Sequence, residues 1–201
     1  MRILAFTDIH GSKTAFRIIK KKIIYKKPDL LVCAGDISLF EHGFLSIMRK
    51  LNKLNRLIIM VHGNHEDEHI FIKYSKLFKN IIFIHKRHFI KDDALFLGYG
   101  GGGFSVVDKE FEKIAKTKFK KIIQINKDKK IILVTHPPPY NTRLDRLFQG
   151  HCGNKSIRKF VEKNHLDLLI CGHLHENFGK EDMIAQTKIV NPGPYGKIID
   201  I

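Results

Sequence analysis

Short apolar runs, rich in β-branched or leucine side chains, alternate along the chain with longer stretches whose apolar residues recur at helical spacing. Such a short run between polar turns is typical of a buried strand. We expect strands at Arg2–Phe6, Leu30–Ala34, Leu57–Val61, Ile81–Ile84, Leu95–Tyr99, Ile131–Thr135 and Leu166–Cys171. We expect helices at Ser12–Lys27, Phe44–Leu54, Glu66–Lys79 and Asp108–Asn126. Because helices follow strands, the pattern predicts an α/β fold.

Two further segments, 81–99 and 189–201, contain strand-like runs with no helix between them, which predicts additional strands. The 201 residues suit one domain, and we predict a single domain over residues 1–201. No apolar run is long enough to cross a bilayer, so we expect no membrane association. The three cysteines form no CxxC pair, and the first residues lack the pattern of a secretory signal. We therefore expect a cytoplasmic protein.

The formal net charge of +16 raises the question of nucleic-acid binding, because excess cationic side chains neutralise phosphates. The excess is mostly lysine, in pairs and triples that fall on expected helix faces or turns. There is no arginine-rich tract with interleaved aromatic residues. We favour a solvated lysine-rich surface, and binding to nucleic acid remains the less favoured interpretation.

Polar side chains of the kinds that bind metals follow five of the expected strands, at the point where each strand ends. These residues are Asp8, His10, Asp36, Asn64, His65, His136, His173 and His175. In open α/β sheets the ligand crevice lies outside the carboxyl ends of the strands. Segments that are distant in sequence therefore meet there, and we expect these side chains to line one pocket.

Imidazoles, carboxylates and one amide oxygen, without thiolates, suit divalent ions such as Zn, Mn or Fe. In an extended segment residues i and i+2 point the same way, which puts Asp8 with His10 and His173 with His175. Asp36 stands alone and suits a bridging carboxylate. Taken singly, the aspartates and the asparagine would be ordinary turn or helix-cap residues. Together with histidines at the strand ends, the set favours a metal site.

The motifs Asp8-Ile9-His10, Gly35-Asp36, Gly63-Asn64-His65-Glu66, Thr135-His136 and Gly172-His173-Leu174-His175 resemble those of the calcineurin-like metallophosphoesterases, in the same order. The resemblance covers nearly the whole chain, and it is to the short, single-domain, phosphodiesterase-type members. It implies a four-layer α/β/β/α sandwich with two central mixed sheets.

The resemblance also implies two divalent metal ions, which can be manganese (Mn), Fe, Ni or Zn, and the sequence does not determine which. One ion would be held by Asp8, His10, Asp36 and His175, and the other by Asp36, Asn64, His136 and His173. His65 would be the catalytic residue, which stabilises developing charge or protonates the leaving oxygen. A hydroxide bridging the metals would attack the phosphorus. Glu66 is expected to orient an imidazole.

The predicted function is hydrolysis of a phosphate ester, and a phosphodiesterase acting on small or nucleotide-like substrates is preferred. Two alternatives are a nuclease that uses the same chemistry, motivated by the positive charge, and a non-catalytic metal-binding interaction scaffold. The oligomeric state is left open. Four residues between the last two motifs have two interpretations of equal weight, as substrate contacts or as parts of a solvated loop. They are Arg143, Arg146, His151 and Asn154.

Overall fold

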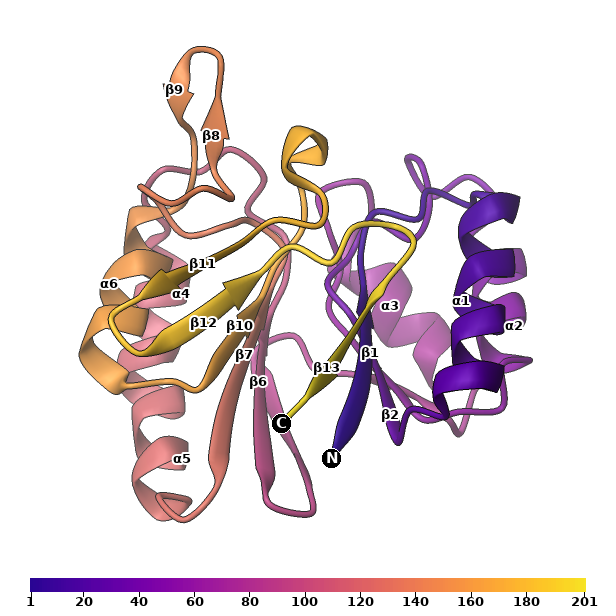
Figure 1. The fold of residues 1–201 in the computed structure, drawn as a ribbon, viewed down its shortest axis with the longest axis horizontal. Coiled ribbons are helices and arrows are strands. Elements are labelled where there is room, and N and C mark those ends of the chain that lie inside the picture. The colour runs from indigo at the N-terminus through magenta and orange to yellow at the C-terminus, as the bar shows by residue number, and fades with distance from the viewer.

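The computed structural model describes residues 1–201. Two β-sheets pack against each other in the centre of the molecule (Figure 1). The first sheet has five strands in the order β13-β1-β2-β3-β4. Its strands are β1 (Arg2–Phe6), β2 (Leu30–Cys33), β3 (Ile58–Met60), β4 (Ile81–Phe83) and β13 (Lys197–Asp200). β1 to β4 run parallel, while β13 pairs antiparallel with β1 at one edge.

The second sheet has six strands in the order β11-β12-β10-β7-β6-β5. Its strands are β5 (Arg87–Lys91), β6 (Ala94–Tyr99), β7 (Lys130–Thr135), β10 (Leu168–Ile170), β11 (Glu181–Ile184) and β12 (Thr187–Val190). The four inner strands are parallel, and β5 and β11 are antiparallel edges. The seven strand positions expected from the sequence all carry strands.

Helices cover the outer face of each sheet (Figure 1). Those on the first sheet are α1 (Lys13–Lys26), α2 (Phe44–Asn52) and α3 (Glu68–Ser75), and those on the second are α4 (Lys109–Ile114), α5 (Lys120–Ile125) and α6 (Lys155–Asn164). The helix expected over Asp108–Asn126 contains a π-helical segment, Ala115–Phe119, between α4 and α5. Side chains cap four of these helices in the way that their residue types favour: Ser12 on α1, Asp67 on α3, Asp108 on α4 and Asn154 on α6.

Three apolar clusters hold the layers together. One of 18 buried residues joins the first sheet to its helices, and one of 17 joins the second sheet to its own. A third of 16, which includes Val32, Ile59, Phe96 and Val134, fills the space between the two sheets. Continuous apolar strands are required because each sheet is buried on both faces. The expected four-layer α/β/β/α sandwich with two mixed sheets is confirmed.

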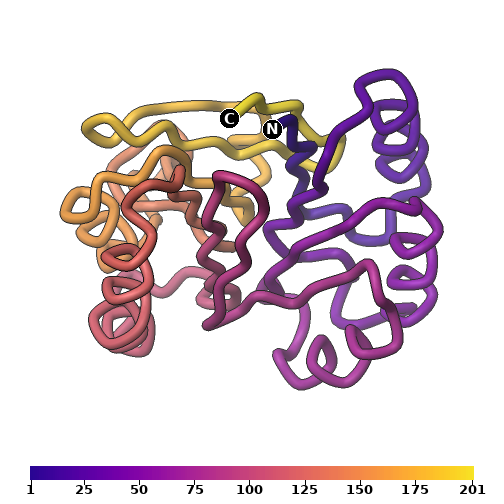
Figure 2. Tube along the Cα trace, turned by 90° about the horizontal axis from the view of Figure 1, so that it is seen from below, coloured from indigo at the N-terminus to yellow at the C-terminus, as the bar shows by residue number.

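The two ends of the chain lie next to each other at the junction of the sheets (Figure 2), where the Met1 amine donates to the Ile201 carbonyl at 2.8 Å. A small hairpin of β8 (Arg146–Leu147) and β9 (Gly150–His151) projects beyond the sheets (Figure 1), and the sequence did not predict it. A short 3₁₀ helix, η2 (His175–Asn177), follows β10. No helix in the structure has the length and apolar character needed to span a bilayer.

Candidate metal centre

The eight side chains singled out in the sequence lie just beyond the ends of five parallel strands. Asp8 and His10 follow β1, Asp36 follows β2, and Asn64 and His65 follow β3. His136 follows β7 in the second sheet, while His173 and His175 follow β10. Both sheets therefore contribute to one site.

The backbone at this site is unusual. Four of the candidate ligands have a positive φ, in the left-handed region that residues other than glycine rarely adopt. They are Asp8 (+52°), His10 (+41°), Asp36 (+50°) and His173 (+73°). Gly63 is required because a Cβ at its position would overlap the Asp36 carboxylate, and a Cβ at Gly172 would overlap Thr7. Strained positions that cluster in this way are characteristic of functional sites.

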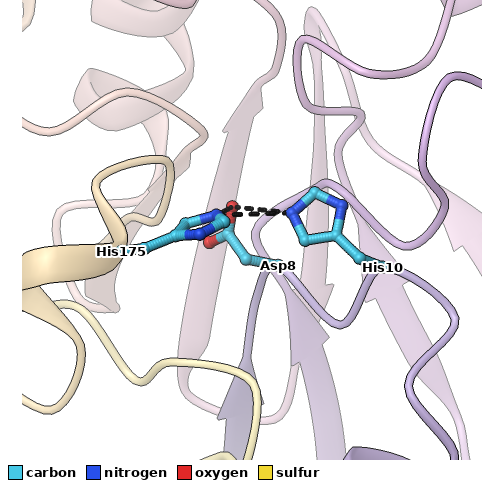
Figure 3. A group of neighbouring side chains, drawn as sticks. All are labelled: Asp8, His10 and His175. Atoms are coloured by element: carbon cyan, nitrogen blue, oxygen red, sulfur yellow. Dashed lines mark hydrogen bonds and ion pairs between the residues drawn. The ribbon is translucent and has the colours of Figure 1, made fainter.

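Asp8, His10 and His175 form the first group of candidate ligands (Figure 3). The His175 Nε2 lies 3.5 Å from Asp8 Oδ1 and 3.3 Å from His10 Nε2. His10 donates from Nδ1 to the Ser38 carbonyl at 3.0 Å, which leaves Nε2 as the ring nitrogen that faces the site. The nearby Asp8 carboxylate favours the protonated imidazole and raises the pKa of His175.

The Asp8 carboxylate is anchored through one oxygen and open at the other. Its Oδ2 accepts a hydrogen bond from Thr7 Oγ1 at 2.7 Å and one from the backbone N–H of His173 at 3.1 Å. Its Oδ1 is buried and has no hydrogen-bond partner. Because a buried carboxylate oxygen without a partner is costly, this atom requires a positive group beside it.

Asp36, Asn64 and His136 form a second cluster on the other side of the site. The His136 Nδ1 donates to the Ala34 carbonyl at 2.8 Å, while its Nε2 lies 2.9 Å from Asn64 Oδ1 and 3.3 Å from Asp36 Oδ2. With Nδ1 as the donor, three acceptor atoms face one another unless a proton or a cation lies between them. Burial opposes protonation of His136, but the hydrogen bond and charge of Asp36 outweigh it and raise its pKa to about 9.

His173 and His65 complete the site. The Nε2 of His173 is buried without a hydrogen-bond partner, and burial followed by the nearby His136 lowers the pKa of His173 to about 4. His173 thus offers a free lone pair. The His65 backbone N–H donates to Asp36 Oδ1 at 3.0 Å, and its ring Nε2 lies 3.9 Å from Asp36 Oδ2. His65 therefore stands at the edge of the ligand set and is tied to its central carboxylate.

These residues fit divalent metal ions. Three overlapping groups bring their donor atoms within 4.8 Å of one another: Asp8-His10-His175, Asp8-Asp36-His136 and His10-Asp36-His65. Asp8, His10 and Asp36 each belong to two of the groups, so these three residues connect the whole set. The unpartnered Asp8 Oδ1 and His173 Nε2 are the atoms that a cation would satisfy. Imidazole, carboxylate and amide donors together suit ions such as Zn, Mn, Fe or Ni.

Glu66 was expected to orient an imidazole, and this expectation is wrong, because its carboxylate forms no hydrogen bond with a histidine. Oε1 accepts hydrogen bonds from the backbone N–H and the hydroxyl of Ser38, and Oε2 accepts from the Gly63 N–H at 3.2 Å. Burial raises the pKa of Glu66 to about 7, against the effect of these donors. Glu66 thus ties the loop after β2, which carries Asp36, to the turn after β3, which carries Asn64.

The four residues between the last two motifs divide into two kinds. His151 donates from Nδ1 to the buried Asp145 at 2.7 Å, and Asn154 accepts the Ile157 N–H as the N-cap of α6. The side chains of His151 and Asn154 therefore form hydrogen bonds within the protein. Arg143 and Arg146 are exposed in and before the β8–β9 hairpin, where a loop interpretation fits them.

Three aromatic residues at the site were not identified from the sequence, and one of them, Phe178, stacks on the His175 ring with the centroids 4.8 Å apart. The Phe40 ring lies 4.4 Å from the His65 ring, and the Phe104 ring lies 4.5 Å from the His173 ring, centroid to centroid. Both follow strand ends, at β2 and β6, but no spacing in the sequence distinguishes an exposed phenylalanine beside an imidazole from one in the core.

Residues 1–177 match the model of the calcineurin-like phosphoesterase family. An uncharacterized protein of Methanocaldococcus jannaschii is 32% identical over 204 residues, which cover 96% of this chain and 88% of that protein.

Two solved structures share the fold. A dimetal phosphatase from Danio rerio superposes with a TM-score of 0.67 at 10% identity, over 94% of this chain and 86% of that one. An archaeal phosphodiesterase gives a TM-score of 0.55 at 18% identity, over 96% and 84%. The motif order, the two-sheet fold and the family match agree, and the chain belongs to the calcineurin-like phosphoesterase family.

Proposed function

We propose that this protein is a two-metal phosphoesterase that hydrolyses phosphodiesters. The observation that carries the proposal is a set of candidate ligand atoms that lack a partner or face one another: the buried Asp8 Oδ1 and His173 Nε2 have no hydrogen-bond partner, and Asn64 Oδ1 and Asp36 Oδ2 face His136 Nε2 at 2.9 and 3.3 Å. Such a set is stable only around positive charge. Two divalent cations would supply Lewis-acid polarisation of the phosphoryl oxygens and would acidify a water molecule.

In this proposal one ion is held by Asp8, His10, His175 and Asp36, and the other by Asp36, Asn64, His136 and His173. The Ser38 and Ala34 carbonyls fix the tautomers of His10 and His136, so that both rings present Nε2 to the site. Glu66 and Gly63 hold the two loops that carry Asp36 and Asn64 in register. These contacts form the site before any substrate arrives.

His65 is proposed as the residue that donates a proton to the leaving oxygen or stabilises the charge that develops on it. Its side chain is 20% exposed, so a substrate can reach it. Its backbone hydrogen bond to Asp36 holds it beside the reacting centre. Removal of a general acid slows a reaction by about 100- to 10,000-fold.

A metal-reconstitution assay tests the proposal. The protein is stripped with a chelator, Mn, Ni, Zn or Mg is added back singly, and hydrolysis of bis(4-nitrophenyl) phosphate and 4-nitrophenyl phosphate is measured. We expect metal-dependent turnover with the diester preferred, because the motifs resemble those of the short, phosphodiesterase-type members of the family. Preference for the monoester would make the protein a phosphatase, and no turnover with any bound ion would favour a binding role.

Two pairs of variants assign the activity to the site. Asp36→Asn should lower kcat/KM by more than about 100-fold, because the change removes the carboxylate shared by two ligand groups. The exposed Asp128→Asn is its control. His65→Ala should lower kcat by about 100-fold or more while metal binding persists, and the exposed His69→Ala is its control. A fully active His65→Ala protein would remove His65 from the mechanism.

A further inference from the structure

Three phenylalanines are exposed at the surface, and two of them make edge-to-face contacts with imidazoles of the candidate metal centre. Phe40, which contacts the His65 ring, is 68% exposed to solvent. Phe104, which contacts the His173 ring, is 64% exposed. Most large apolar side chains of this chain lie in the three core clusters. Exposed aromatic rings beside imidazoles of a candidate metal centre are therefore informative, because exposed apolar groups at a polar cleft are typical of ligand-binding surfaces.

Phe40 is held at the site by an unfavourable backbone. It occupies, with Glu41, the tip of a tight turn closed by the Leu39–His42 bridge, and both tip residues have positive φ, +45° and +63°. Asparagine and glycine are the residues that suit such a turn. Glu41 accepts the Asp67 N–H at 2.9 Å, which accounts for its presence. The Phe40 ring packs on the His65 ring, which points to a role of the ring at the site.

Phe104 is held from both sides by backbone hydrogen bonds. Before it, the Gly100 N–H donates to His85 Nδ1 at 2.8 Å and the Gly101 N–H donates to the His62 carbonyl at 3.0 Å. After it, the Ser105 carbonyl accepts from the Asn154 side chain at 2.8 Å. The backbone of the loop is thus fixed while the ring remains exposed, so the position of Phe104 does not depend on packing in a core.

The two phenylalanines lie in loops that follow strands of different sheets. Phe40 lies in the connection between β2 and α2, and Phe104 in the connection between β6 and α4. They contact imidazoles on the two sheets, His65 after β3 and His173 after β10. A phosphodiester bound at the metal centre has two ester substituents, and each can extend toward one of the rings.

We propose that Phe40 and Phe104 are stacking residues that select phosphodiesters with a planar aromatic base on an ester substituent, that is, nucleoside esters. This inference rests on the proposed function and specifies its substrate class. Every base has a π-face, so stacking on a phenyl ring tolerates different bases. The apolar neighbours Leu39, Val106 and Val107, exposed by 48%, 45% and 55%, widen these surfaces and offer no hydrogen-bonding side chain that would read one base.

The test compares two substrates that share a leaving group. Thymidine 5′-(4-nitrophenyl phosphate) and methyl 4-nitrophenyl phosphate differ only in the retained substituent, so any stacking of the nitrophenyl group cancels in their kcat/KM ratio. The wild-type protein, loaded with the most active metal, should prefer the thymidine ester. The double variant Phe40→Asn/Phe104→Ala should lower that preference by about tenfold, and the single variants should show which ring carries it.

Two controls separate stacking from structural effects. Tyr25→Ala removes an aromatic ring that is 78% exposed near the end of α1 and should leave the ratio unchanged. Phe40→Asn places a residue that tolerates positive φ in the strained turn, so its thermal unfolding midpoint should equal or exceed that of the wild type.

Each contrary outcome has one meaning. Equal losses with both substrates would show that the rings only position His65 and His173, which overturns the inference. A wild-type protein that hydrolyses both esters without preference, or a double variant that keeps the preference, would also overturn it and leave the phosphodiesterase standing. Turnover of neither ester would contradict the proposed function itself.

Discussion

Asp8 and Asp36 share one arrangement at the level of single atoms. In each carboxylate one oxygen accepts a backbone N–H from a neighbouring loop, His173 for Asp8 and His65 for Asp36. The other oxygen faces histidine nitrogens: Asp8 Oδ1 lies 3.5 Å from His175 Nε2, and Asp36 Oδ2 lies 3.3 Å from His136 Nε2. The protein thus fixes the orientation of each carboxylate and leaves one oxygen for a cation, which is how supporting contacts orient metal ligands.

Glu66 gives a prediction at this scale. Glu66→Gln should lower the free energy of unfolding by about 1–3 kcal/mol, because the amide replaces one of two acceptor oxygens with an N–H that faces backbone or hydroxyl donors. Urea denaturation in the presence of chelator measures the change. The exposed Glu176→Gln is the control. A Glu66→Gln protein as stable as the wild type would show that Ser38 and Gly63 do not need the carboxylate.

At the level of elements, the site depends on loops that are anchored by helices and turns outside it. Asn154 caps α6 by accepting the Ile157 N–H at 2.9 Å, and its side-chain N–H₂ donates to the Ser105 carbonyl of the loop that carries Phe104. One side chain therefore starts a helix and holds a loop of the site. The residue also links the second sheet's helix layer to the candidate substrate surface.

Two substitutions separate these functions of Asn154. Asn154→Asp keeps the capping oxygen and loses the bond to Ser105, while Asn154→Ala loses both. We expect Asn154→Ala to lower the free energy of unfolding by about 1–2 kcal/mol, and Asn154→Asp to lower it by less. Urea midpoints measure both. If Asn154→Asp and Asn154→Ala have the same urea midpoint, the capping oxygen of residue 154 does not stabilise the protein.

The sequence predicted the elements whose signal is local. Arg2–Phe6 and Ile131–Thr135 are continuous apolar runs, and they form β1 and β7 as expected. Glu181–Ile184 forms the edge strand β11, but its acidic residues hid it, because an edge strand in contact with solvent has no apolar requirement on its open face. The β8–β9 hairpin was missed because two-residue strands have no periodicity to detect.

The site shows the same division between local and tertiary information. The convergence of the candidate ligands could be predicted because each follows a strand, and topology brings strand ends together. The partner of Glu66 was wrong because the choice between an imidazole and the Ser38 and Gly63 N–H groups is made by loop geometry. The Phe40 and Phe104 contacts are tertiary as well, and nothing in their sequence neighbourhood encodes them.

At the scale of the whole molecule, the two sheets meet through an apolar layer and through buried histidines at one side of it. His85 follows β4 of the first sheet and forms a bridge to Gly98 of β6 in the second. Its Nδ1 accepts the Gly100 N–H, and its Nε2 lies 3.5 Å from Glu68. Burial, followed by the charges of His62 and Lys86, lowers the pKa of His85 to about 2.

This shift predicts a pH dependence of stability. A histidine whose pKa is lower in the folded than in the unfolded state binds protons only on unfolding, so its contribution is present above pH 6.5 and is lost as the pH falls below it. The stability advantage of wild type over His85→Asn should shrink between pH 6.5 and 4.5, by up to about 1.4 kcal/mol per pH unit. Urea titrations with chelator at three pH values measure it, and a constant difference would contradict it.

The left-handed backbone at Asp8, His10, Asp36 and His173 has a consequence for attempts to improve the protein. A redesign that optimises folding alone would place glycine or asparagine at these positions, because those residues relieve the strain. Each such change would remove a candidate ligand or replace a charged or imidazole donor by a neutral amide, so stability and the proposed catalysis are in direct conflict at these four positions. Thermostable versions of this protein must therefore gain their stability in the helices and outer loops, where residue choice is free of that conflict.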